Sequence, residues 1–185
     1  MAYGVFSPAV PASAKDVMLG EGAVWKNKGE AGEAALGATA GGSKLEIDRK
    51  IKDIKYDGAY GQTKGMRRYE QLVPTLTVKF LKLNYTNMVA GLPTTVTDGT
   101  DADGTYKEIS FDLEFVAGDV LTNVAFVGQK LDGGATTIIV ENALNISKVA
   151  FDFKSKDEVS VDMEYTGFYA YATPTTPPIL IQDAV

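Results

Sequence analysis

The sequence predicts a mainly β protein, an antiparallel β-sandwich or partly closed barrel with one short α-helix. Three observations predict it: apolar and polar residues alternate along several segments, Gly-containing turns separate these segments, and helical periodicity is scarce. A chain of 185 residues is long enough to bury one core without disulfides. We therefore expect a single β-sandwich domain over residues 21–172, preceded by an N-terminal arm (1–20) and followed by an extended C-terminal arm (173–185).

The alternating segments predict strands with one buried and one solvated face. Leu76, Val78 and Phe80 alternate with polar residues, after which the apolar positions move to Leu81 and Leu83, which predicts a bulge or twist at the strand's end. The same alternation runs through 109–115, 149–153 and 159–165.

Shorter strands and turns complete the pattern. The short apolar pairs that predict strands lie at 45–47, 54–56, 124–126 and 138–140, and the predicted turns at 41–42, 57–58 and 132–134. A short helix is expected within 84–90, where Gly91 and Pro93 end it, and one helical turn within 118–123.

The composition excludes several classes of chemistry. The chain has no cysteine and no histidine, which excludes disulfides, thiolate nucleophiles, Cys/His metal sites and imidazole bases. No segment has the length of a membrane span or the pattern of a signal peptide, so we expect a soluble protein with no membrane partner. We expect that the chain is not an enzyme and that it binds no cofactor. A carboxylate enzyme stays open as an alternative, with the same-face pairs Asp112 with Glu114 and Asp162 with Glu164 as its candidates.

The charge is unevenly distributed. The net charge of −6 argues against a surface that grips nucleic acid. Residues 44–70 nevertheless hold eight basic residues against five acidic ones, which leaves ten basic and nineteen acidic residues elsewhere. This segment is either the solvated face of a strand pair or a surface that docks on the acidic body of another copy. Docking of this kind, repeated head to tail, makes rings or filaments.

Two further segments are not predicted to belong to the hydrophobic core. Residues 94–105 are polar, so they predict a long exposed acidic loop. Its aspartates suggest calcium, but Gly99 stands where an EF-hand needs its first ligand, and we expect no metal. In the C-terminal arm, Ile179, Leu180 and Ile181 follow a proline-rich stretch, which predicts either a disordered end or an arm laid on a neighbouring subunit.

Residues 37–69 carry the most specific motifs of the chain. A Gly-Ala-Thr-Ala-Gly-Gly turn leads into alternating strands, an Asp-Gly turn and a Lys-Gly-Met-Arg-Arg-Tyr stretch. This segment resembles the signature segment of the tail tube (major tail) proteins of long-tailed, siphovirus-like bacteriophages. Residues 123–130, 138–145 and 156–158 are similar to the second half of the same family, so the resemblance covers roughly residues 21–171.

The resemblance implies a structural virion protein of the phage tail, assembled in the cytoplasm of the host bacterium. Members of the family are β-sandwiches flanked by a helix; six copies form a ring, and rings stack head to tail into the hollow tube that delivers the genome. The implied partners are other copies of the chain, the tape measure protein, and the tail terminator and tail tip proteins. Related tubes also occur in contractile tails, secretion systems and bacteriocins.

The resemblance also assigns roles to residues of this chain. The loop at 56–70 corresponds to the long family loop that reaches across ring and stack contacts. The candidate inter-subunit contacts are Lys64, Arg67, Arg68, Tyr69, Ile179, Leu180 and Ile181.

In such a conduit DNA would be passing cargo, which slides more freely along a neutral or negative wall. The candidate lumen-facing residues are Asp152, Lys154, Asp162 and Glu164, together with Ser160. A rival hypothesis is a monomeric β-sandwich binding module, such as a capsid decoration or adhesin-like protein, that uses 94–105 for recognition.

Overall fold

The computed structural model describes residues 18–37, 39–58, 60–81, 85–131, 133–147, 149–152 and 160–183. It is mainly β with antiparallel sheets, as the sequence predicts. The main sheet contains β1 (Met18–Lys26), β2 (Ala34–Gly37), β3 (Thr39–Asp53), β4 (Arg67–Phe80), β7 (Leu121–Lys130), β8 (Ala135–Leu144), β9 (Ala150–Asp152), β10 (Ser160–Gly167) and β11 (Ile179–Asp183). A separate two-stranded sheet is formed by β5 (Thr94–Asp101) and β6 (Gly104–Phe111).

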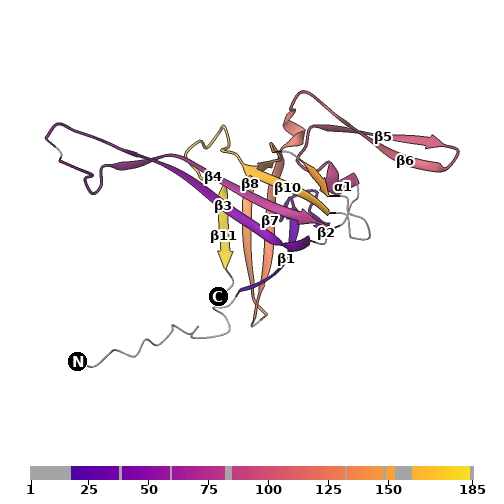
Figure 1. Cartoon of the computed structure of the whole chain (residues 1–185), viewed down its shortest axis with the longest axis horizontal. Coiled ribbons are helices and arrows are strands. Elements are labelled where there is room, and N and C mark those ends of the chain that lie inside the picture. Colours follow the sequence, from indigo (N-terminus) through magenta and orange to yellow (C-terminus); the bar gives the residue numbers. More distant parts are fainter. Residues whose placement is uncertain are drawn as a thin grey trace.

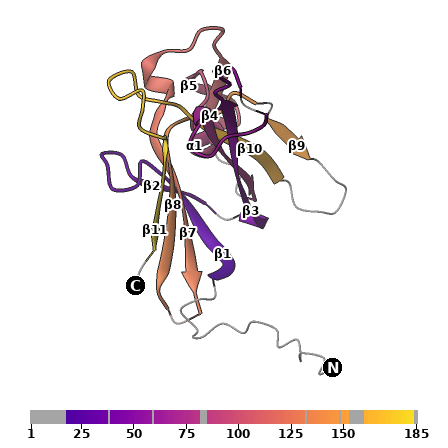
Figure 2. The same ribbon diagram turned by 90° about the vertical axis from the view of Figure 1, so that its left-hand side faces the viewer.

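The main sheet bends into two groups of strands that face each other. Its hydrogen-bonded order is β2-β1-β7-β8-β10-β4-β3, with β11 added to β8 and β9 added to β10. β7, β8 and β11 run across the direction of β3, β4 and β10 (Figures 1 and 2). The path ends at β2 and β3, so the described strands do not close into a barrel.

A narrow junction joins the two groups. β8 and β10 pair only through Leu144 with Thr166 and Ala143 with Gly167. The core fills the space that the bend encloses and draws on both groups, with Val24, Val124 and Val140 from one and Leu76, Val78, Phe80, Val161, Met163 and Tyr165 from the other. Burial of these side chains is the main stabilising contribution to the fold, at about 25 cal/mol per Å² of apolar surface.

Several strand predictions are confirmed and several are corrected. The alternation in 76–80 and 161–165 is matched by alternating burial in β4 and β10. β4 ends at Phe80, where the phase of its apolar residues changes. Gly41 and Gly42 do not form the predicted turn but lie within β3, where the register shifts between Thr39 and Ser43. Gly42, with φ of 84°, supplies the left-handed conformation that such a bulge needs.

The predicted strand at 109–115 is confirmed only as far as Phe111, and its predicted buried face is wrong. β6 ends at Phe111, and the side chains of Phe111, Leu113 and Phe115 are exposed although their alternation predicts a buried face. The reason is that β5 and β6 pair only with each other and project from the body, so no second layer covers them (Figure 1).

Helical structure is confined to short segments among the described residues. α1 (Tyr85–Met88) lies within the predicted 84–90, and a single 3-10 turn, η2 (Ala117–Asp119), lies at the edge of the predicted 118–123. No helix in the described part of the chain is both long and apolar enough to cross a membrane.

Candidate assembly surfaces

The first surface is the outer half of the β3–β4 hairpin, which we call the basic arm (residues 47–74). β4 has exposed residues from Arg67 to Gln71 and alternates with buried residues only from Pro74 onward. The irregular connection is residues 54–66, so the predicted 56–70 loop is corrected: its last four residues belong to β4. The arm extends away from the body on one side (Figure 1).

Pro74 marks the root of the basic arm. β10 pairs with β4 only as far as Thr75, and Pro74 is the next position outward. Beyond it, β4 is paired with β3 alone. Because proline has no amide hydrogen to donate, it is suited to a position where a strand becomes an edge. The basic arm is therefore a two-stranded ribbon that leaves the sheet at a defined residue.

Ion pairs within the basic arm link side chains of its two strands. The guanidinium of Arg67 contacts the carboxylate of Asp53 at 2.7 Å. The Nζ atoms of Lys50 and Lys52 lie 3.3 and 3.6 Å from the carboxylate of Glu70. The hydrogen bond from Lys50, with the charges of both lysines, lowers the pKa of Glu70. These pairs are exposed, so each contributes little to stability in water.

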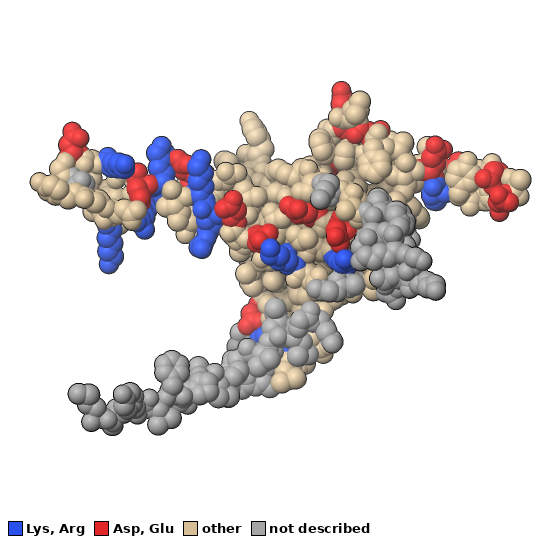
Figure 3. Space-filling view, in the orientation of Figure 1, with Lys and Arg blue, Asp and Glu red and all other residues tan. Residues whose placement is uncertain are grey.

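Four basic side chains of the arm are available to another partner. They are exposed, and none forms an ion pair with another described residue: Arg49, Lys55, Lys64 and Arg68. Of the predicted contacts, Lys64 and Arg68 are thus available, whereas Arg67 is already bound to Asp53. In Figure 3 the arm carries much of the visible blue surface.

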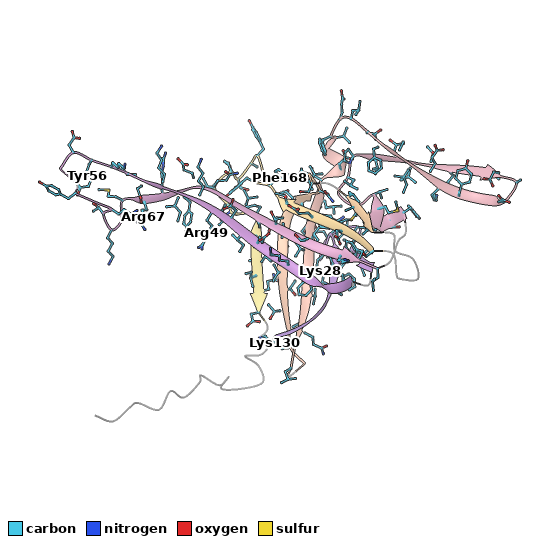
Figure 4. The ribbon with its side chains drawn as sticks, viewed as in Figure 1. Lys28, Arg49, Tyr56, Arg67, Lys130 and Phe168 are labelled. Carbon is cyan, nitrogen blue, oxygen red and sulfur yellow. The ribbon has the colours of Figure 1, made fainter. Side chains whose placement is uncertain are left out.

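Apolar side chains of the basic arm are also uncovered. Tyr69 and its cross-strand partner Ile51 are 63% and 50% exposed. Ile54 and Tyr56 continue the exposed apolar surface toward the tip (Figure 4). An isolated two-stranded ribbon is only marginally stable in water, and most residues of this one are exposed.

A groove of about 1160 Å³ lies at the root of the basic arm. Its walls come from Ile47, Tyr69 and Leu72 of the arm and from Phe168 and Ile179 of the body. The lining is mainly apolar, and Arg49 adds a positive charge (Figure 4). No sequence pattern predicts this groove, because the segments that line it are far apart in the chain.

The second surface is the β5–β6 hairpin, which we call the acidic arm (residues 94–111). It holds four acidic residues (Asp98, Asp101, Asp103 and Glu108) and one basic residue, Lys107. The predicted exposed loop is therefore corrected to an exposed hairpin, with Val96 opposite Ile109 and Gly99 opposite Tyr106. β-branched threonines favour strands in this polar segment, a signal that the glycines and aspartates obscured.

Local contacts shape the acidic arm. Asp101 Oδ1 accepts hydrogen bonds from the backbone amides of Asp103 and Gly104, at 2.9 and 3.2 Å, and so closes the turn. Tyr106 covers Gly99, where an added Cβ would lie 2.4 Å from the ring. Lys107 is paired with Asp98, and the hydrogen bond between them raises the pKa of Lys107.

Exposed apolar side chains continue from the acidic arm into the segment that follows it. Phe111 is 62% exposed and Tyr106 is 46% exposed. Leu113, Phe115 and Val116 beyond β6 are also exposed. Asp112 accepts a hydrogen bond from the Thr95 hydroxyl at 2.8 Å, and Glu114 is exposed.

The predicted C-terminal contacts lie on the chain's own sheet. Ile179, Leu180 and Ile181 belong to β11, which pairs with β8 from Val140 to Thr136. Ile179 is half-buried, whereas Leu180 and Ile181 stay exposed. Lys130 Nζ lies 2.9 Å from Asp183 and the Thr136 hydroxyl 2.5 Å from it, and these contacts lower the pKa of Asp183.

The predicted lumen-facing residues are only partly described. Asp162 and Glu164 alternate with the buried residues of β10, so they point away from the core. Asp162 lies opposite Lys79 of β4, with 3.9 Å between their charged atoms. Ser160 is buried, Asp152 pairs with it across β9 and β10, and Lys154 lies outside the described residues.

In the described ranges, no three acidic side chains are close enough together to hold a metal ion. The surfaces suited to contact another protein are the basic arm, the acidic arm, the groove at the root of the basic arm and the exposed side of β11. Neither the scan against protein-family models nor the search of curated proteins returned a match to this chain.

Proposed function

We propose that the chain is a structural subunit that self-assembles into hexameric rings, and that these rings stack into the hollow tail tube of a bacteriophage. In that role the tube is the conduit through which DNA passes into the host. The proposal joins the resemblance of residues 37–69 to one structural observation: two hairpins project from one body and leave their apolar side chains uncovered in a single copy.

Uncovered ribbons of this kind favour assembly on physical grounds. Their outer edges carry backbone groups that can pair with another chain, and proteins usually protect such edges. Tyr69 and Phe111, one on each arm, are more than half exposed although each carries a large apolar side chain. Covering such side chains stabilises an interface by removing apolar area from water. In a subunit of a larger β-structure, the unpaired edges and the exposed apolar side chains are both covered by neighbouring copies.

The proposed contacts follow from the surfaces. The basic arm, with Lys64, Arg68 and Tyr69, reaches another copy in the ring or in the next ring. The exposed Leu180 and Ile181 of β11 provide a further contact at the edge of the sheet. The outer face of β10, with Asp162 and Glu164, is the proposed wall of the lumen.

Negative-stain electron microscopy of the purified protein tests this proposal. We expect six-fold rings or stacked hollow tubes at high protein concentration, and fewer of them at high salt because exposed ion pairs are screened. Particles that stay monomeric at every concentration and salt, also with an added tail initiator protein, would contradict it.

The second candidate function is a monomeric binding module of the capsid decoration or adhesin type. The projecting acidic arm favours it, because a rigid body that presents one exposed hairpin is suited to recognition. This function predicts a monomer or a small closed oligomer in the same micrographs.

A further inference from the structure

We propose that the acidic arm of one copy is the binding partner of the basic arm of the next copy. The proposal rests on the self-assembly proposed above and specifies which two surfaces meet. None of the motifs that carry the resemblance to tail tube proteins lies within residues 94–111, the acidic arm.

The charges of the two arms are complementary. The basic arm has seven basic and four acidic residues, a net charge of +3, and the acidic arm has one basic and four acidic residues, a net charge of −3. Both arms keep charges unpaired among the described residues: Lys64 and Arg68 on one, and Asp103 and Glu108 on the other. Opposite charges of this kind set the register and the encounter rate of an interface.

The arms are matched in form as well as in charge. Each is a two-stranded antiparallel ribbon with at least one unpaired edge and exposed aromatic side chains, among them Tyr69 on one and Tyr106 and Phe111 on the other. Contact on one face of each ribbon removes the apolar side chains of that face from water. Ile109 and Phe111 lie on the face that the alternation predicts to be buried, and the 62% exposure of Phe111 is thereby explained, because its cover comes from a second molecule.

The placement of the arms requires that the contact be between copies. They project from opposite sides of the body, along its longest dimension (Figures 1 and 3). One copy cannot bring its own arms together without unfolding the body between them. Repeated from copy to copy, the contact is heterologous and generates a ring or a filament, whereas a mutual exchange of arms would close a dimer.

Paired charge reversals test the contact directly. K64E/R68E makes the basic arm acidic, and D103K/E108K makes the acidic arm basic; these four side chains make no described contact that holds a strand in place. Each variant alone then brings like charges together. An equimolar mixture restores opposite charges at every junction, because the two variants can alternate. E30K/A31K, in the turn between β1 and β2, is the control: it adds positive charge at two exposed positions whose side chains make no described contact.

Assembly is measured by mass photometry and sedimentation against protein concentration, after circular dichroism has verified that each variant is folded. We expect each arm variant alone to need at least about tenfold more protein to assemble than the wild type. The mixture and the E30K/A31K control should assemble at the wild-type concentration. Rescue in the mixture excludes misfolding as the cause of the single defects.

The outcomes separate the two proposals. If the wild type forms rings but D103K/E108K assembles equally well, or if the mixture is not rescued, the arm-to-arm contact is wrong and the proposed function stands. If the wild type forms only closed dimers and the mixture is rescued, the contact is supported and the tube is contradicted. A wild type that stays monomeric overturns both.

Discussion

At the scale of the residue, Gly167 occupies a position with no room for a side chain. It lies where β10 leaves β4 and meets β8. A Cβ at this position would lie 2.8 Å from Val140 Cγ1, 2.9 Å from Pro74 Cγ and 3.1 Å from the Glu141 carbonyl oxygen. Only a residue without a side chain allows the two groups of strands to approach this closely.

Gly167→Ala is therefore expected to destabilise the protein by about 1–3 kcal/mol, the usual cost of overpacking a closely packed site. The measurement is the free energy of unfolding from denaturant titration. Gly118→Ala is the matched control, because an added Cβ there meets no atom within 4 Å. Equal stability of the two variants would show that the junction can relax.

The ion pairs of Glu70 predict a pH dependence. Lys50 and Lys52 lower the pKa of Glu70 below its ordinary value of 4.5, so the carboxylate stabilises the folded state above that pH. This contribution is lost as the pH falls through the lowered pKa. The difference in stability between the wild type and Glu70→Gln should therefore be present at neutral pH and vanish in acid. A difference that does not change with pH would show that the pairs are not formed in solution.

At the scale of the element, the two arms differ from the body in what covers them. β4 and β10 have neighbours in the sheet and a core beneath, whereas β5 and β6 have only each other. Local opening of a segment becomes easier as its buried apolar contacts decrease. The arms are therefore the parts of the molecule that open most easily in a free copy.

Hydrogen exchange measured by mass spectrometry checks this expectation. In the monomer, amides in 94–111 and 48–70 should exchange at least about a hundredfold faster than those in 76–80 and 161–165, which line the core. In assembled material the arms should become protected while the core is unchanged. Arms that are already protected in the monomer would contradict the uncovered ribbons.

The elements also show how far sequence can predict this structure. Alternation in 76–80 and 161–165 predicts both the strand and its burial, because a covering layer exists within the chain. The same alternation in 109–111 predicts the strand but not its exposure. Periodicity reports that a face is apolar and does not report which molecule covers it.

At the scale of the whole molecule, the sequence predicts the mainly β class but not the bend that encloses the core. The bend depends on a few pairings, such as Ala143 with Gly167, between segments far apart in the chain. The basic segment is recognisable from composition alone. Its acidic counterpart is recognisable only when 94–111 is seen as a hairpin on the opposite side of the body.

The opposed arms have a geometric consequence for any series of copies joined through them. The distance from one copy to the next is then set by the length of two hairpins and the body between them, all within one covalent chain. An antiparallel strand rises about 3.4 Å per residue. Removing two cross-strand pairs from the acidic arm would therefore shorten its reach by about 7 Å. The axial or angular spacing of such an assembly is thus encoded in hairpin length.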